Sequence, residues 1–224
     1  LGNPEADRLS IVSFRVRAPL ESPGSSSHDG SYLHHNFVVA LLNDLFGIQA
    51  RGGCSCAGPY GHRLLAIDTA HSRAFEREIE HGREGIKPGW VRLNFNYFVT
   101  DTVRDYLVDA VELVADYGHR LLADYRFQPS TGLWTHRSNL AGRQLRIPDL
   151  RRVVTDTDAA FTVDAVDTPT ELGEDVLARQ HVQAHGILAT RPDSFENGPT
   201  GLNAGFEALR WFPLPPSCLR DGEI

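Results

Sequence analysis

The sequence of 224 residues contains no methionine, a single lysine and only three cysteines. Three cysteines cannot form the disulfide framework of a small secreted protein, so we expect free thiols in a reducing, cytoplasmic compartment. No apolar run approaches the roughly 18 residues that a transmembrane helix requires, so we expect no membrane partner. Because an initiator methionine is absent, we interpret the chain as a fragment of a longer protein.

Basic residues are also in deficit, and the formal net charge is −7. An acidic chain is a poor partner for nucleic acid or for anionic lipid, so we expect neither. The hydrophobic share of 41% and the charged share of 23% are those of an ordinary globular protein. A chain of this length can bury a hydrophobic core without disulfide bonds.

The apolar pattern predicts a mixture of strands and helices. Alternating apolar residues indicate strands over residues 10–17, 48–51 and 90–97. Apolar residues at helical spacing indicate helices over residues 34–46, 72–80 and 102–122. Gly47 supplies a stop for the first helix, and Thr100 or Asp101 supplies a cap for the last. A hairpin is expected over residues 125–136.

We expect a domain over residues 1–140 and an extension over residues 141–224, and the composition changes after about residue 152. Residues 153–178 hold seven acidic and no basic side chains, which predicts a solvated, weakly structured segment. The alternative is an acidic arm that packs on a basic partner surface. Residues 208–219, ALRWFPLPPSCL, predict an extended segment docked on the core, because exposed Trp and Phe side chains would be unfavourable.

The glycine-rich segment RGGCSCAGPYGH, residues 51–62, is the first candidate site. Its glycines allow close approach to a ligand, and Arg51 with the loop amides favours a nucleophilic thiolate. One alternative is a flexible turn with two inert thiols. Another is a metal site, for which the ligands would be Cys54, Cys56, His62 and His71. We expect no metal, because the Cys-x-Cys pair lacks the Cys-x2-Cys spacing of structural zinc.

Arg92 is the second candidate, since strand alternation places it on the polar face with Asn94 and Asn96. The planar guanidinium binds a carboxylate through two hydrogen bonds, although an ordinary exposed arginine remains the alternative. His34 and His35 are expected at the surface, near the start of a helix. Lys87 is expected in a surface loop.

Taken in order, these segments resemble the C-terminal part of class V aminotransferases. The resemblance covers residues 8–122 and is most similar to the cysteine desulfurase and selenocysteine lyase branch. It consists of the strand IVSF, a helix ending in LLNDLFGI, an Arg-x-Gly-x-x-Cys-Ala-x-Pro loop, and a strand leading into the last helix. The loop motif is satisfied by Arg51, Gly53, Cys56, Ala57 and Pro59.

The resemblance implies an α+β fold, the small C-terminal domain of the pyridoxal-phosphate-dependent aspartate-aminotransferase-like fold, with a small sheet covered by helices. It implies that Cys56 takes sulfur from L-cysteine as a persulfide and that Arg92 binds the substrate α-carboxylate. Arg51 falls on the arginine that opens the cysteine loop. The sequence departs from the desulfurase pattern at Cys54, where many carry His, and at Asn94, where the motif has Ser.

The resemblance further implies pyridoxal 5'-phosphate as cofactor, bound by a lysine in a large domain. Lys87 follows the cysteine loop instead of preceding it and does not match that lysine. We therefore expect the large domain to lie outside this chain, the isolated chain to be inactive, and the whole enzyme to be a homodimer acting on an amino acid. The alternatives are a transaminase or lyase for another amino acid, or a non-catalytic binding or assembly module.

Overall fold

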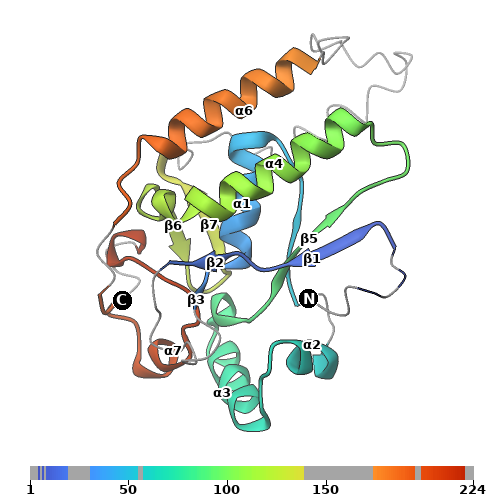
Figure 1. The fold of residues 1–224 in the computed structure, drawn as a ribbon. Coiled ribbons are helices and arrows are strands. Elements are labelled where there is room, and N and C mark those ends of the chain that lie inside the picture. Colours follow the sequence, from blue (N-terminus) through green and yellow to red (C-terminus); the bar gives the residue numbers. More distant parts are fainter. Residues whose placement is uncertain are drawn as a thin grey trace, which may run out of the picture.

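The computed structural model describes residues 5, 7, 9–19, 31–54, 58–138, 174–194 and 198–219. In this part of the chain, helices surround small antiparallel sheets, which is the mixed α+β architecture expected from the sequence (Figure 1). No helix of the described residues has the length and apolar character needed to cross a membrane.

The first part of the chain contains a three-stranded antiparallel sheet. Its strands are β1 (Ile11–Phe14), β5 (Trp90–Asn94) and β4 (Arg51–Gly53), and each strand is antiparallel to its neighbour. Val91 and Leu93 are buried and Asn94 is exposed, so the alternation predicted from the sequence is confirmed. A second small pair joins β2 (Arg17–Ala18) to β3 (Ser31–Tyr32).

Helices α1 (His35–Phe46) and α4 (Asp101–Tyr117) both contribute buried apolar side chains to the core. Gly47 ends α1 in the left-handed conformation at φ 66°, as expected for a glycine helix stop. The side chain of Thr100 accepts a hydrogen bond from the Val103 amide and begins α4. Helix α3 (Thr69–Glu80) begins in the same way at Asp68.

Several boundaries differ from the sequence predictions: β1 and β5 are shorter than predicted, and α3 begins at Thr69 instead of Ser72. Strand β4 lies at residues 51–53 instead of 48–51, and residues predicted as loop form helix α2 (Gly58–Leu64). The regular part of α4 ends at Tyr117 and continues as a 3-10 turn, η2 (Gly118–Asp124). Gly118 begins η2, and an ideal Cβ on it would lie 3.0 Å from Leu41 of α1. The glycine therefore allows this turn to pack closely on α1.

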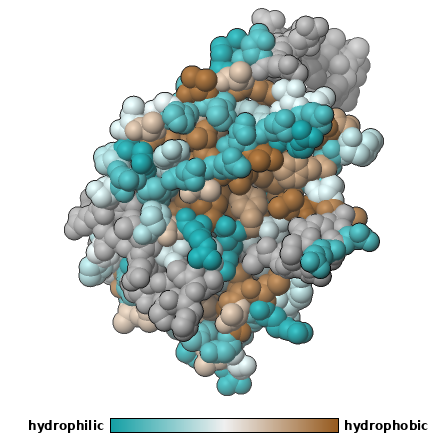
Figure 2. Space-filling model, viewed as in Figure 1, coloured by the Kyte–Doolittle hydropathy of each residue, from teal (hydrophilic) through white to brown (hydrophobic). Residues whose placement is uncertain are grey.

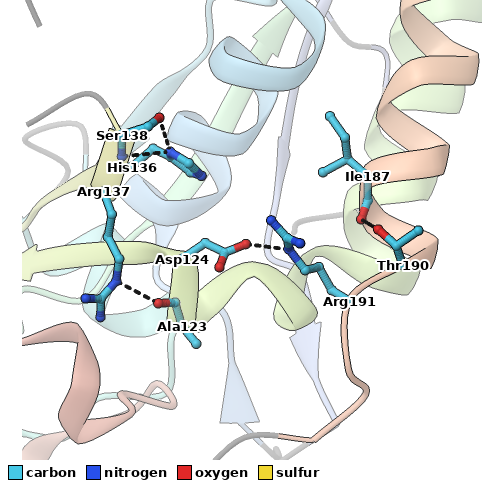
Figure 3. Close-up of polar contacts among 8 residues, drawn as sticks. All are labelled: Ala123, Asp124, His136, Arg137, Ser138, Ile187, Thr190 and Arg191. Atoms are coloured by element: carbon cyan, nitrogen blue, oxygen red, sulfur yellow. Dashed lines mark hydrogen bonds and ion pairs between the residues drawn. The ribbon is translucent and has the colours of Figure 1, made fainter.

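The predicted hairpin is confirmed as β6 (Tyr125–Gln128) and β7 (Leu133–His136). Helix α6 (Glu174–Ala189) lies beside α4 (Figure 1). Its C-terminal end is attached to η2 by an ion pair in which Arg191 Nε lies 2.6 Å from Asp124 Oδ2 (Figure 3). Arg137, which follows the hairpin, donates to the carbonyl of Ala123 in the same region (Figure 3).

The Pro- and aromatic-rich C-terminal segment docks on the core, as the sequence predicted. Helix α7 (Ala204–Leu209) packs on α3, and the chain then runs past η1 (Glu84–Ile86) to η4 (Pro216–Cys218). Phe212 and Leu214 are fully buried. Residues on both sides of the predicted boundary at residue 140 therefore share one core, whereas the boundary itself and most of the acidic stretch over residues 153–178 lie outside the described residues.

Apolar side chains also reach the surface in a recess of about 740 Å³ between α4 and β1 (Figure 2). Val12 of β1 and Val108 of α4 lie on this recess and are 38% and 41% exposed. Strand β1 is an edge strand of the three-stranded sheet among the described residues.

We expect Phe212→Ala to destabilise the protein by about 3–5 kcal/mol, because it removes a fully buried ring that contacts Phe127, Phe206 and His34. Urea denaturation would measure the free energy of unfolding. The matched control is Phe98→Ala, since Phe98 is 68% exposed and its truncation should change stability by no more than about 0.5 kcal/mol. Equal effects of the two variants would show that the C-terminal segment does not belong to the core.

Candidate functional site

The structure brings together two of the site residues predicted from the sequence. In the register of β4 and β5, Arg51 lies directly opposite Arg92. On the other side of β5, Arg92 pairs with Ser13 of β1. Directly opposed residues of antiparallel strands project from the same face of the sheet. Arg51 and Arg92, which we call the arginine pair, therefore share the sheet face opposite to that of Val91.

The arginine pair has no hydrogen-bond or ion-pair partner among the described residues. Arg51 is exposed and Arg92 is half-buried. Like charges directly opposite one another on neighbouring strands destabilise a sheet, and an anion placed between them reverses this effect. A planar carboxylate matches the fork geometry of a guanidinium and can accept two hydrogen bonds from it. The arrangement is suited to binding a small carboxylate.

The neighbouring amides on this strand are already hydrogen-bonded. Ser10 Oγ donates to Asn94 Oδ1 at 3.0 Å, and Asn94 Nδ2 donates to Asn96 Oδ1 at 2.9 Å. Both Asn94 and Asn96 are exposed. Their hydrogen bonds to one another and to Ser10 support the end of β5 and leave the arginines as the charged donors of this face.

The start of the cysteine loop is described, but its predicted catalytic residue is not. Gly53 ends β4 with a backbone φ of 119°, a value that residues other than glycine rarely adopt. Cys54 follows it and is exposed, whereas Cys56 lies outside the described residues. The third cysteine, Cys218, is buried against the Leu122 carbonyl, and burial raises the pKa of its thiol to about 12. Cys218 is therefore an inert core residue.

Two cavities meet at Cys54 and Lys87. The smaller, of about 230 Å³, is bordered by Arg51, His35 and Thr131. The larger, of about 400 Å³, lies between α2 and α3 and has a mainly apolar lining that includes Phe75. Arg51 therefore borders a space beside the exposed thiol of Cys54.

Lys87 does not fit the role of the cofactor-binding lysine. Its ammonium forms an ion pair with Glu84, and its side chain is 41% exposed. A Schiff-base lysine must instead direct its amine into an enclosed cofactor site. Since Lys87 is the only lysine of the chain, the residues present do not provide a covalent site for pyridoxal phosphate.

The prediction that His34 and His35 are surface residues is wrong. They are 1% and 6% exposed because residues distant in the sequence cover them, above all Trp211 and Phe212. His34 Nδ1 accepts from the Asn36 amide and caps α1, and its Nε2 lies 3.1 Å from the Gly85 carbonyl oxygen. A neutral ring with its proton on Nε2 satisfies both contacts. The residue at the N-cap position of α1 is histidine, where Ser, Thr or Asp is usual, and this was the one indication in the sequence that His34 caps the helix.

One ligand of the metal site considered from the sequence, Cys56, lies outside the described residues. Within the described part of the chain, no group of three or more His, Cys, Asp or Glu side chains could hold a metal ion. His71 pairs instead with Asp68 at the start of α3, with His71 Nδ1 3.0 Å from Asp68 Oδ2.

Comparisons of the chain with protein-family models, with curated proteins and with solved structures found no match in any of the three. The residues of the site and the sequence resemblance are therefore the observations that bear on the function of the chain.

We expect the protein to lose stability as the pH falls below about 6.5, where histidine in an unfolded chain becomes protonated. Burial lowers the pKa of His34 well below that value and also lowers the pKa of His35. Below pH 6.5 the unfolded state therefore binds more protons than the folded state. The free energy of unfolding should fall by up to about 1.4 kcal/mol per pH unit for each of the two histidines.

Urea denaturation between pH 7.5 and pH 5 would measure this slope. His34→Gln should make it shallower, whereas His81→Gln should leave it unchanged because His81 is exposed. A wild-type stability that is constant across this range would contradict the assignment of two neutral, buried rings.

Proposed function

We propose that this chain is the small domain of a pyridoxal-phosphate-dependent enzyme of the class V aminotransferase type, and that its arginine pair binds the α-carboxylate of an amino-acid substrate. The observation that carries the proposal is the pairing of Arg51 with Arg92 across β4 and β5. The resemblance assigns Arg92 to carboxylate binding, and the register supports this role by placing a second guanidinium beside it.

The proposed reaction of the whole enzyme is removal of sulfur from L-cysteine. The thiol of Cys56 gives up its proton and attacks the sulfur of the substrate. The C–S bond breaks with its electron pair left on the carbon skeleton, and protonation of that carbon gives alanine and a Cys56 persulfide. The part that falls to the described residues is to bind and orient the substrate. Carboxylate binding by the arginine pair fixes one end of the substrate beside the loop that begins at Cys54.

In this proposal, pyridoxal phosphate and its lysine belong to a large domain outside the chain. The ion pair and the exposure of Lys87 support this view. The chain's own contribution is the anion-binding sheet face and the cysteine loop.

The proposal predicts that the chain binds L-alanine, a product that carries the same carboxylate, and that Arg92→Lys weakens this binding about tenfold or more. Lysine keeps the positive charge but loses the planar fork, and a tenfold change corresponds to about 1.4 kcal/mol. NMR titration with L-alanine, monitored at the backbone amides of β4 and β5, would give the dissociation constant.

Arg73→Lys is the matched control, because Arg73 is an exposed arginine on α3 with no ion pair among the described residues. If wild-type protein shows no saturable shift with L-alanine, the arginine pair is not a carboxylate site. If Arg92→Lys keeps wild-type affinity and lowers the melting temperature, Arg92 has a structural role.

We also expect the purified chain not to retain pyridoxal phosphate covalently. After incubation with the cofactor and dialysis, the absorbance spectrum should show no aldimine band, because the only amine side chain is the exposed Lys87. A band that survives dialysis and is lost in Lys87→Ala would overturn the assignment of the cofactor lysine to another domain.

A further inference from the structure

His35 lies where four segments of the chain meet. Its ring stacks on Trp211 of the C-terminal segment, with ring centroids 5.9 Å apart and an interplanar angle of 26°. It also contacts the ends of the two strands that carry the arginine pair. An ideal Cβ on Gly89, just before β5, would lie 2.7 Å from His35 Cδ2, and one on Gly52 of β4 would lie 3.0 Å from His35 Nδ1.

The glycines at these positions allow a spacing that no other residue permits. An ideal Cβ on Gly89 would also lie 2.6 Å from the carbonyl carbon of Gly53, so the backbones are in direct contact where β4 ends and β5 begins. His35 packs against this contact. Gly53, which lies at this contact, precedes Cys54 and belongs to the strand that holds Arg51.

Both ring nitrogens of His35 face oxygen acceptors. Nδ1 lies 2.9 Å from Asn36 Oδ1, and Nε2 lies 3.2 Å from the carbonyl oxygen of Lys87. The orientation of the Asn36 amide is set by its Nδ2, which donates to the Gly132 carbonyl at 2.9 Å. A neutral imidazole carries one N–H and can donate to only one of the two oxygens, whereas a protonated ring donates to both.

We propose that His35 is a positioning residue for the arginine pair, and that its protonation tightens carboxylate binding at that pair. The inference rests on the proposed carboxylate site but concerns a residue that does not touch the ligand. A protonated ring ties the start of α1 both to Asn36 and to the chain that enters β5. It also adds positive charge to the cavity that Arg51 borders.

Titratable and charged groups from α1, from β4 and from η1 with the loop that follows it face His35. His34 adjoins it in α1, with ring centroids 4.3 Å apart. Arg51 and Cys54 border the shared cavity from β4 and the cysteine loop, and Glu84 and Lys87 border it from η1 and the loop that follows. Glu84 and Lys87 are paired with one another, so Arg51 is the cation of this set without a partner among the described residues.

The direction of the pH effect follows from the burial of the ring, which lowers the pKa of His35 below 6.5. Protonation therefore takes place as the pH falls below that value. Burial and the neighbouring His35 also lower the pKa of His34.

The test is an NMR titration of the full chain with L-alanine at several pH values from 7.5 down to the start of acid unfolding. We expect the dissociation constant of the wild type to fall about three- to tenfold with the pH, the effect of one hydrogen bond gained. The imidazole signal of His35 should report the same apparent pKa as the affinity. This comparison is made in wild-type protein and does not depend on whether a variant folds.

His35→Gln keeps a donor of similar size but cannot be protonated, so its affinity should be weaker at low pH and independent of pH. Trp134→Phe is the matched control, because Trp134 belongs to the same buried aromatic cluster and its indole nitrogen has no partner in the described structure. It should retain the wild-type pH dependence. If His35 had a purely structural role, His35→Gln would lower the stability of the protein and leave the pH dependence of the affinity as in the wild type.

Two results would overturn the inference. One is wild-type binding that depends on Arg92 but not on pH, which would leave the carboxylate site intact and remove the role of His35. The other is an unchanged pH profile in His35→Gln. Absence of L-alanine binding at every pH would overturn both this inference and the proposed function.

Discussion

The burial of the neutral His34 ring is the constraint on which the packing of the molecule depends. Its Nδ1 begins α1 by accepting from the Asn36 amide, and its Nε2 lies within hydrogen-bond distance of the Gly85 carbonyl. Trp211 stacks on the ring at 5.4 Å, and Phe212 packs edge-on at 4.6 Å. One side chain thus joins the first helix, the turn before β5 and the C-terminal segment. A charge on this ring would be unfavourable for all three.

This packing has a direct effect on the candidate site. The start of α1 is pressed against β4 closely enough that an ideal Cβ on Gly52 would lie 2.5 Å from Asn36 Oδ1. Strand β4 therefore packs closely on the start of α1. Its register with β5 places Arg51 opposite Arg92. Two guanidinium groups held side by side by the backbone are preorganised for an anion, because their repulsion is already overcome by the fold. The C-terminal segment supports this geometry from the far side of His34 and His35.

The parts of the fold that were predicted correctly depend on local pattern. Helix α1 was recognisable from its apolar spacing and Gly47, and the hairpin of β6 and β7 from a turn between two apolar runs. Arg92 was placed correctly on the polar face because strand alternation is a property of the backbone. Helix α2 was missed because a segment rich in glycine and proline has low helix propensity, which contacts with the rest of the molecule can override.

The sequence by itself determined the principal helices and strands up to the hairpin, α2 apart, and identified the two arginines as candidates, because periodicity, caps and glycine stops act over a few neighbouring residues. Only the tertiary structure decided that the two arginines meet and that His34 and His35 are buried. Those outcomes depend on pairings between residues 41 positions apart for Arg51 and Arg92, and on the docking of Trp211, far along the chain, onto the start of α1. Polarity alone placed both histidines at the surface, but the energy of burying Trp211 and Phe212 against them, together with hydrogen bonds for both rings, favours the interior.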